Sequence, residues 1–538
     1  MIKESAKDLI PVVMTPDLRR DLTREAAVRG VESIFPIIGT HKEIHVSNPR
    51  VLNKNHGYAQ HKQALLTGGS LVEPLVGDVT IKDKKTGKVL DKKKRHTLLQ
   101  LPYSTDNHTF VVKGNEYMVK HQLRTKPGVY TRRRANDDIE SSFNLAKGQN
   151  FRMSMAPEKG HLFVEYGTSK IPAYSVLRGM GLSHGDISNK WGTALADRNR
   201  DRFDSNRDSH IDKLYNKVVR SGKRTHSSTQ DKIGAVFNEY NKTEIDPTTT
   251  KLTLGKSHTR VGPQLMLEAS SKILDVYNGR QEEDERDALQ FQKVVSPEDF
   301  IQERLEKKRH ELSFKYRNKA DLQKESKVDK ILPSGALTRT LTGFITNSQI
   351  SQLPTQINPV EMLDSTMAIT RVGEGGISDS RAVPDSVRSI HPSTFGVMDP
   401  YKTPDSAAIG VETRLSTGAM KDRQGNLYMP LLDTQTNKEV YMSASSMADH
   451  AIAFPNQDTD KGRVDVFMGG KVKKVKPKDV RYQIPDVESM YTAATSMVPF
   501  LDSTQGNRIM MGSKYSTQSL PLVDKEVPLV VSASRDKN

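Results

Sequence analysis

Residues 347–410 read NSQISQLPTQINPVEMLDSTMAITRVGEGGISDSRAVPDSVRSIHPSTFGVMDPYKTPDSAAIG. Amides, hydroxyls, glycines and prolines dominate this stretch, and no continuous apolar pattern runs through it, so the sequence predicts a long polar loop. Loops of this length are usually either functional or disordered. Spaced apolar residues favour attachment to a core over disorder: Ile350, Leu353, Val360, Met362, Leu363, Ile369, Val372 and Phe395. We therefore predict a surface that holds another polymer.

The composition of the chain favours a multidomain protein with a polyanionic partner. A chain of 538 residues is too long for one hydrophobic core, and about three domains are expected. The formal net charge of +16 favours nucleic acid or an anionic membrane surface, although a basic protein without such a partner has the same charge balance. No stretch approaches the roughly 18 apolar residues of a spanning helix, so we expect no membrane partner. The absence of cysteine excludes disulfides, thiolate zinc sites and thiol nucleophiles.

Patterned segments on both sides of residues 347–410 predict helices and strands. The clearest are a hairpin over 109–119 (TFVVKGNEYMV) and a helix that begins at Ser296, where a capping serine precedes Pro297 and two acidic residues. This helix is expected to turn the charged residues of 303–311 outward and four apolar residues inward, namely Phe300, Ile301, Leu305 and Leu312. The other predicted helices are 15–38, 173–181 and 485–497, and the other predicted strands are 79–81, 89–90, 98–101, 151–155, 161–166 and 465–468, with a turn over 157–160.

Two charged segments have weaker functional interpretations. Residues 186–259 are polar, and 197–208 contain an Asp-x-Asn-x-Asp spacing that is typical of calcium-binding loops. Depending on which aspartate begins the pattern, its sixth position is Arg202 or Ser209 in place of glycine, and its twelfth is Asp208 or Tyr215 in place of glutamate. We therefore interpret it as a solvated charged segment. The three arginines of 132–134 are either a solvated surface or phosphate contacts.

The motifs of a free-standing enzyme are missing from the sequence. It contains no Walker loop, no Gly-x-Ser-x-Gly, no His-Glu-x-x-His and no dense cluster of aspartates. His41 and His45 are four residues apart, but no third ligand accompanies them, so ordinary surface histidines are favoured. Amide-rich and basic segments suit contacts to phosphates, sugars and base edges instead.

Six short segments, in one fixed order, carry a family resemblance. They are VESIFPI (31–37), TFVVKGNEYMVKHQLRTKPGVY (109–130), HLFVEYGTSKIPAYSVLRGMG (161–181), NSQISQLPTQINPVE (347–361), IHPSTFGVMDPYKTPDSAAIG (390–410) and ATSMVPFLDSTQGNRIMMGSKYSTQSLP (494–521). Together they resemble the RNA polymerase beta subunit. The fourth is similar to the family segment that lines the RNA–DNA hybrid and forms the rifamycin pocket.

The resemblance implies a mixed α/β, multidomain chain built from the family's protrusion, lobe and fork. The expected boundaries are 1–135 for the first part of the protrusion, 136–290 for the lobe, 291–345 for the return of the protrusion and 346–538 for the fork. The chain stops about halfway along a full beta subunit. In this it resembles the N-terminal half of the split beta subunits of giant (jumbo) bacteriophages, whose C-terminal half is a separate polypeptide.

The resemblance also implies site residues. Asn507, Arg508 and Lys514 are expected at the nucleoside triphosphate, where Arg508 matches the family arginine that reaches the triphosphate and Lys514 replaces an asparagine. The alternative is that Asn507 and Arg508 cap the preceding helix. The residues expected to contact nucleic acid are Gln349, Gln352, Asn358, Arg381 and Gln518. Catalytic residues are not expected in this chain, because the resemblance implies that Mg²⁺ is held by the aspartates of a beta-prime partner.

The rifamycin pocket of the family is altered in this sequence. The family's aspartate, histidine, arginine and serine correspond to Thr355, Ser365, Ala368 and Thr370, and a Glu-Thr-Pro-Glu-Gly motif becomes KTPDS (402–406). The resemblance therefore implies that the hybrid wall is retained and that the drug pocket is not. We expect the assembled enzyme to resist rifampicin.

The resemblance implies a subunit of a DNA-directed RNA polymerase, a nucleotidyltransferase that is active only when assembled. Its expected partners are a C-terminal beta half, intact or split beta-prime-like subunits, template DNA, the RNA transcript and nucleoside triphosphates, with or without a sigma-like specificity subunit. It is expected in the cytoplasm or a phage-induced compartment of an infected bacterium, or packaged in the virion. The alternative function is a non-catalytic nucleic-acid-binding or virion structural protein on a degenerate polymerase scaffold.

Overall fold

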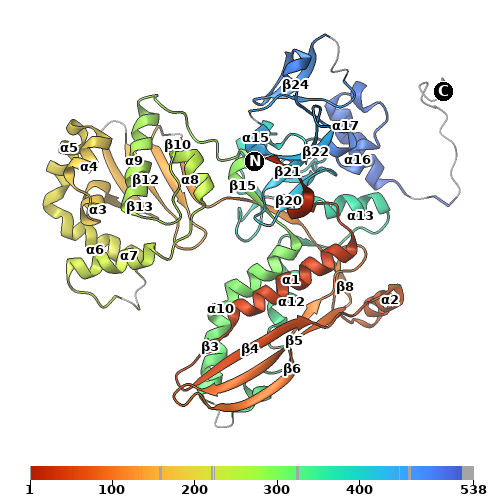
Figure 1. The fold of residues 1–538 in the computed structure, drawn as a ribbon, viewed down its shortest axis with the longest axis horizontal. Helices are drawn as coiled ribbons and strands as arrows, with labels where there is room; N and C mark the ends of the chain where they lie inside the picture. Colours follow the sequence, from red (N-terminus) through yellow and green to blue (C-terminus); the bar gives the residue numbers. More distant parts are fainter. Residues whose placement is uncertain are drawn as a thin grey trace. The chain divides into compact units, whose positions relative to one another are not determined.

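The computed structural model describes residues 2–134, 136–156, 160–219, 222, 224–322, 326–447, 449–457, 462–520 and 522–523. Two compact units form (Figure 1). The outer unit consists of Met1–Arg124 and Lys293–Asn538, and the inserted unit consists of Thr125–Gln292. The many sheets and helices confirm the expected mixed α/β, multidomain class.

One part of the outer unit is a four-stranded sheet that packs against two long helices (Figure 1). The strands, in the order β3-β4-β5-β6, are β3 (Ile37–Ile38), β4 (Lys42–Val51), β5 (Val72–Asp83) and β6 (Val89–Pro102), and the helices are α1 (Pro16–Ile34) and α10 (Pro297–Leu322). The helices approach closely at Gly30, where a Cβ atom would lie 2.7 Å from Leu305 Cδ1. Helices α1 and α10 are far apart in the sequence, yet they share one hydrophobic core.

The predicted helix over 15–38 ends earlier than expected, at Ile34. Phe35 is extended because it precedes Pro36, whose ring disfavours a helical conformation at the preceding residue. The strands predicted over 89–90 and 98–101 are confirmed, and the structure joins them in one long strand, β6. The predicted hairpin is confirmed as β7 (Phe110–Val112) and β8 (Asn115–Val119).

Two larger sheets of the outer unit accompany the small sheet that contains β7 and β8. The five-stranded one has the order β15-β9-β17-β19-β18, with β15 (Gln292–Val295), β9 (His121–Thr125), β17 (Ala368–Thr370), β19 (Glu412–Leu415) and β18 (Met398–Asp399). The nine-stranded one is built mainly from 420–483, including β20 (Met420–Asp422), β21 (Leu427–Asp433), β22 (Lys438–Ser443), β24 (Val464–Met468) and β25 (Lys471–Val475). Strand β24 confirms the strand predicted at 465–468. The helix predicted over 485–497 was wrong, because only α16 (Ala493–Ser496) forms there, after a 3-10 turn at Glu488–Met490.

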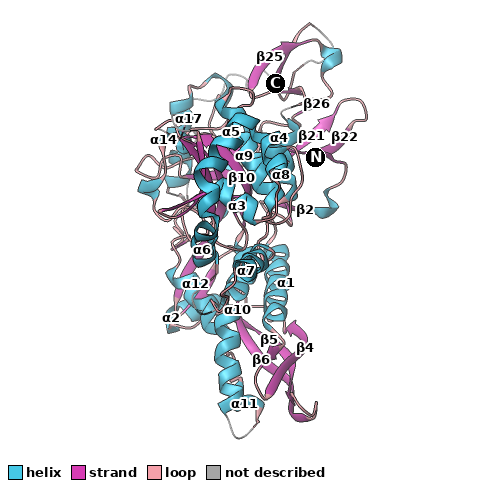
Figure 2. Cartoon of the chain, turned by 90° about the vertical axis from the view of Figure 1, so that its left-hand side faces the viewer, coloured by secondary structure: helices cyan, strands magenta, loops and turns pink. Residues whose placement is uncertain are grey.

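The inserted unit is a five-stranded antiparallel sheet covered by helices, which lie in front of the strands in Figure 2. The strands are β10 (Gly128–Arg133), β11 (Ile139–Asn144), β12 (Phe151–Ala156), β13 (His161–Tyr166) and β14 (Ser169–Pro172), in that order. Strands β12 and β13 and helix α3 (Ala173–Gly179) confirm predicted elements. The predicted turn over 157–160 lies mostly outside the described residues.

The interpretation of 197–208 as a solvated charged segment agrees with its side chains, which are exposed or partly exposed apart from Asn199, but the polar stretch 186–259 around it, for which no helix was predicted, is largely helical. It contains α4 (His184–Trp191), α5 (Thr193–Phe203), α6 (Arg207–Val218), α7 (Thr229–Tyr240) and α8 (Pro247–Leu254). The calcium-like pattern begins within α5, where Asn199 is buried and donates to the carbonyls of Gly160 and Leu195. Each helix is short and mostly polar, so its stability comes from a few buried side chains.

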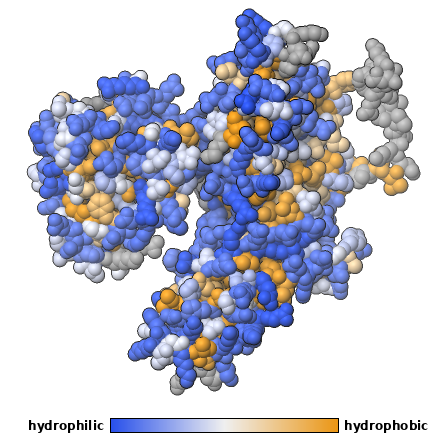
Figure 3. Space-filling model, in the orientation of Figure 1, coloured by the Kyte–Doolittle hydropathy of each residue, from blue (hydrophilic) through white to orange (hydrophobic). Residues whose placement is uncertain are grey.

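The exposed surface is largely hydrophilic, with small hydrophobic patches, in the view of Figure 3. This agrees with a hydrophobic content of only 35%. Among the described residues, no helix combines the length and the apolar character needed to cross a membrane.

Candidate nucleic-acid interface

Residues 347–410 form short elements, so the prediction of a continuous loop was wrong. They include β16 (Ser351–Gln352), α13 (Pro359–Thr366), β17 and α14 (Asp385–Arg388). Helix α13 begins where Asn358 Oδ1 accepts a hydrogen bond of 2.8 Å from the Val360 amide, and proline follows the cap. Of the expected apolar anchors, Ile350 and Ile369 are buried, but Leu353 is 66% exposed and Leu363 is 39% exposed.

Asn358 also fastens the end of a distant helix, α17 (Gly506–Gln518). Its Nδ2 donates to the carbonyl oxygens of Ser516 at 3.1 Å and Ser519 at 2.8 Å. The last carbonyls of a helix have no partner within the helix, so this amide replaces water there. Since Asn358 is buried and both ends of its amide are occupied, its observed contacts join α13 to α17.

The KTPDS segment (402–406) holds the side of the same helix. Lys402 is buried, and its Nζ donates to the Ser513 carbonyl at 2.9 Å and to Thr517 Oγ1 at 3.0 Å. Burial lowers the pKa of the Lys402 ammonium. Asp405 forms an ion pair with Lys514. Three residues of 347–410 therefore determine where α17 lies.

Asn507 and Arg508 lie in the first turn of α17, and both side chains are exposed. The Arg508 guanidinium contacts only Met511, with Nη1 at 3.7 Å from Sδ, among the described residues. No hydrogen bond from either side chain to the preceding helix α16 is seen in that part of the chain, which gives the capping alternative no support. The first turn of a helix presents free amides and a partial positive charge. An exposed arginine beside these amides forms a site suited to an anion.

The other expected contact residues divide by exposure. Gln349, Arg381 and Gln518 are exposed, and Gln352 is partly exposed in β16, which pairs with β8. At the altered drug pocket, Thr355 is exposed, whereas the other three replaced residues are buried: Ser365, Ala368 and Thr370. Ala368 pairs with Arg414 in the sheet of β17 and β19.

Sequence reasoning missed a basic groove of about 1130 Å³ that includes Gln349. It lies between α10, α12 (Thr338–Asn347) and the glycine-rich residues 373–376. Its basic lining residues are Arg304, Lys307, Lys308, Lys315 and Arg339, and its acidic ones are Glu311 and Glu374. The groove residues of α10 lie three or four residues apart, so a helical projection of 300–316 would have placed them on one face of the helix. The contributions of α12 and 373–376 depend on tertiary structure.

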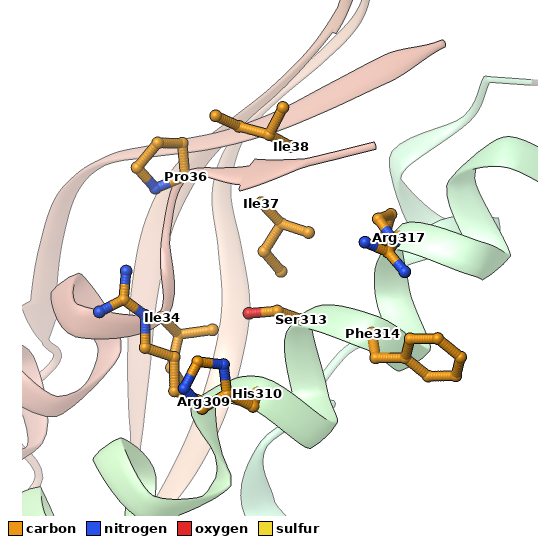
Figure 4. Close-up of a pocket in the computed structure, with 9 residues that line it drawn as sticks. All are labelled: Ile34, Pro36, Ile37, Ile38, Arg309, His310, Ser313, Phe314 and Arg317. Carbon is orange, nitrogen blue, oxygen red and sulfur yellow. The ribbon is translucent and has the colours of Figure 1, made fainter. Parts of the chain in front are cut away.

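A smaller pocket of about 290 Å³ lies beside β3 and α10 (Figure 4). Ile34 and Ile37 contribute apolar surface, and Arg309, His310 and Arg317 of α10 contribute basic groups. None of the residues expected at a site lines this pocket.

The arginines of 132–134 are engaged with carboxylates in the inserted unit. Arg132 Nε donates to Glu140 Oε1 at 2.7 Å, Arg134 pairs with the same carboxylate, and Arg133 lies 3.9 Å from Glu283. Burial alone would raise the pKa of Glu140, but the bonds from Arg134 and Arg132 outweigh burial and lower it. These contacts engage all three arginines with carboxylates.

The described residues contain no group of three or more His, Asp or Glu side chains arranged to hold a metal ion.

Comparison with known proteins gives two family matches. Residues 125–295 match RNA polymerase Rpb2, domain 2, and residues 352–420 match RNA polymerase Rpb2, domain 3. The first match covers almost the same residues as the inserted unit. The second includes α13, β17 and the KTPDS segment.

The curated proteins similar to this chain include DNA-directed RNA polymerase beta subunits. The chain is 25% identical over 490 residues to that of Prochlorococcus marinus (strain MIT 9301) and 26% identical over 490 residues to that of strain AS9601. It is 25% identical over 481 residues to the subunit of Synechococcus sp. (strain WH7803). Each alignment covers 83% of this chain and 44% of the relative, so the chain spans less than half the length of these curated relatives. These findings confirm the resemblance to part of a beta subunit.

Proposed function

We propose that this chain is the N-terminal beta-like subunit of a DNA-directed, multisubunit RNA polymerase, in which it lines the main channel and holds the template DNA and the RNA–DNA hybrid. The observation that carries this proposal is the attachment of α17 to residues 347–410. Asn358, Lys402 and Asp405 bind one helix whose first turn exposes Asn507 and Arg508. Similarity to beta subunits over 83% of the chain supports it.

Arg508 is the residue that we assign to the incoming nucleoside triphosphate. A guanidinium presents several donors in a fixed plane, which matches the oxygens of a phosphate. The free amides at the start of α17 add to the attraction of negative charge. Asn507 supports this site from the same turn, and Lys514 joins it only after exchanging Asp405 for a phosphate.

The nucleic-acid strands are assigned to the exposed polar residues of the same unit. Gln349, Arg381 and Gln518 are exposed, and Gln352 is partly exposed, so their amides and guanidinium remain accessible to sugars, phosphates and base edges. Asn358 is assigned a positioning role, because its amide is committed to α17.

Catalysis requires partner subunits in this proposal. The Mg²⁺ ligands are assigned to a beta-prime-like subunit, and the ions would activate the RNA 3′ hydroxyl and stabilise the departing pyrophosphate. The remainder of the beta function is assigned to a C-terminal beta half encoded separately, as in giant bacteriophages. The enzyme would then act in an infected bacterium, in its cytoplasm or a phage-induced compartment, or travel in the virion.

Reconstitution tests the proposal. The full chain is mixed with the candidate C-terminal beta half and beta-prime-like subunits, and RNA synthesis on a DNA template is measured with and without Mg²⁺. Stable assembly with template- and Mg²⁺-dependent synthesis is the expected result. Assembly and nucleic-acid binding without any synthesis would favour a non-catalytic scaffold protein instead.

A further inference from the structure

The basic groove between α10, α12 and residues 373–376 contains an anion site that an internal carboxylate occupies. Arg304 is held in place by Phe344, whose ring centroid lies 4.5 Å from the guanidinium carbon, and its side chain is only 13% exposed. Its Nη1 donates to the carboxylate of Glu374, and Lys307 Nζ lies 3.5 Å from the other oxygen of that carboxylate. The Glu374 side chain is itself 60% exposed. Arg304 thus binds an anion that faces solvent, and Lys307, which pairs with Glu303 at 2.6 Å, lies within reach of the same anion.

The backbone that carries Glu374 is fixed, so only its side chain is free to leave. Arg124 Nη2 donates to the Glu374 carbonyl at 2.9 Å, and Gln122 Nε2 donates to the Val372 carbonyl at 3.0 Å. Gly375 has a φ of +89°, and a Cβ atom there would lie 2.7 Å from Arg124 Cζ. Glycine is required at this position for both reasons. Hydrogen bonds from Arg304, together with its charge, lower the pKa of Glu374, which therefore stays ionised at neutral pH.

Lys308 of the groove pairs with Glu311, but two further cations of the groove remain without an acidic partner in the described part of the chain. Lys315 and Arg339 line the groove, are exposed and have no acidic partner among the residues that the structure describes. Asn347, Ser348 and Gln349 add amide and hydroxyl groups. A channel with several cations along its length and polar groups between them suits the repeating phosphates of a polynucleotide backbone.

We propose that this groove binds the sugar–phosphate backbone of a single nucleic-acid strand and that Glu374 is an internal competitor for the phosphate position at Arg304 and Lys307. The choice of nucleic acid as the ligand rests on the proposed function. The role of Glu374 as a competitor rests on its ion pairs with Arg304 and Lys307. Binding releases the Glu374 side chain into solvent while the glycine-rich backbone stays in place. The competitor weakens binding of any strand that does not fill the groove.

The first test measures binding of a fluorescently labelled single-stranded oligodeoxythymidylate to the full chain by anisotropy at low salt. Glu374→Gln is expected to tighten binding by about two- to fivefold, the range that corresponds to loss of a partly exposed ion pair. Glu32→Gln, at an exposed α1 position that has no ion pair among the described residues, is the matched control and should change affinity much less. Equal effects of the two substitutions would show a general charge effect and overturn the competition.

A double-mutant cycle sharpens this test. In an Arg304→Gln background the carboxylate has lost its main partner, so Glu374→Gln should tighten binding by less than it does in the native chain. An undiminished effect would overturn the assignment of Glu374 to the Arg304 site. Circular dichroism and thermal unfolding check that each variant is folded.

The groove itself is tested by its unpaired cations. Arg339→Gln and Lys315→Gln should each weaken oligonucleotide binding and each reduce the salt dependence by about one ion. Lys217→Gln, an exposed position of α6, is the control. The groove proposal would be overturned if neither substitution changed binding, or if the native chain did not bind the oligonucleotide. If an equally charged polyglutamate displaced the strand at equal concentration, the ligand of the groove would be an acidic peptide instead. If these substitutions change oligonucleotide binding but the reconstituted enzyme synthesises no RNA, the proposed function is contradicted and the groove proposal is not.

Discussion

Lys421 Nζ lies 3.1 Å from Glu298 Oε1, and both side chains are buried. This ion pair joins β20 to the first turn of α10, and Lys421 also donates to Asp299 Oδ2 at 2.7 Å. Burial alone would raise the pKa of Glu298, but the charges of Lys421 and Arg19 outweigh burial and lower it. The carboxylate is therefore charged in the interior and depends on its cations.

Lys421→Met should destabilise the protein strongly, because Arg19, at 4.0 Å, would then be the one cation within ion-pair distance of the buried carboxylate among the described residues. Removing one partner of a buried ion pair typically costs about 3 to 5 kcal/mol. Urea unfolding followed by circular dichroism measures the loss, and Lys438→Met at an exposed position of β22 is the control. A loss no larger than that of the control would contradict the structural role of the pair.

Stability should also fall as the pH falls below about 6.5, the pKa of an unfolded histidine. Burial, followed by the charge of Arg19, lowers the pKa of His121 to about 3, so the folded state holds this ring neutral. The unfolded state then binds a proton that the folded state does not, which costs up to about 1.4 kcal/mol per pH unit between these two values. The ring contacts Ser296 Oγ at 2.9 Å and the Thr366 carbonyl at 3.1 Å.

The check on this sign is the unfolding free energy of native protein and His121→Gln between pH 7 and pH 5. The variant is less stable at pH 7, because it loses a packed ring, but its stability should decline less steeply with acid. Parallel pH profiles would show that His121 is not the responsible group. His108, whose pKa burial lowers to about 4, contributes in the same direction and accounts for a residual slope in the variant.

Asn358→Ala and Gln349→Ala should have opposite consequences. Asn358 is buried and bonded to α17, so its loss should cost about 1 to 3 kcal/mol of stability by leaving the carbonyls of Ser516 and Ser519 unpaired. Gln349 is exposed in the basic groove, so its loss should leave stability within about 0.5 kcal/mol and weaken oligonucleotide binding. Thermal unfolding and anisotropy on both variants separate the two roles, and a stable Asn358→Ala protein with weakened binding would refute the positioning role.

The sequence predicted correctly those elements that short-range signals, such as turn and capping residues, specify. The hairpin at 109–119 carries its turn in Lys113 and Gly114, both at positive φ, and α10 begins at the serine and proline that mark its start. The inward residues predicted for α10 are buried, although Glu303 and Arg304, expected outward, are partly buried by contacts with Arg124 and Phe344. Periodicity alone does not report such neighbours.

The sequence could predict individual residues of the site, but not which of them the fold brings together. Exposure of Arg508 and Gln349 agrees with their expected accessibility, but the burial of Asn358 follows from α17, which lies about 150 residues further along the chain. The basic groove has the same origin, since α10, α12 and 373–376 meet only in the folded outer unit. Helices α5 to α8 were missed because their few buried side chains are dispersed among charges.

Arg508→Ala should impair RNA synthesis by the reconstituted enzyme without affecting stability. Its side chain is exposed and makes no ion pair in the described part of the chain, so the fold loses little. A charge-assisted bond to a triphosphate is worth about 1.5 to 3 kcal/mol, which corresponds to about a ten- to hundredfold loss in kcat/KM for nucleotides. Arg280→Ala, an exposed arginine of the inserted unit, is the control. Unchanged nucleotide kinetics in Arg508→Ala would remove this residue from the proposed site.

The reconstituted enzyme should synthesise RNA at rifampicin concentrations that stop enzymes with an intact pocket. Thr355, Ser365 and Ala368 stand where the resemblance places an aspartate, a histidine and an arginine, so charged groups for the drug are missing. Ala368→Arg should not restore sensitivity, because Ala368 is fully buried in β17 and an arginine there would disrupt the sheet. Dose–response measurements on the native enzyme test the predicted resistance to rifampicin. The same measurements on Thr355→Asp, at an exposed position that tolerates the change, test whether a carboxylate there alters the response to the drug. Full inhibition of the native enzyme at ordinary drug concentrations would refute the predicted resistance, because the four replacements would then have left a working drug site.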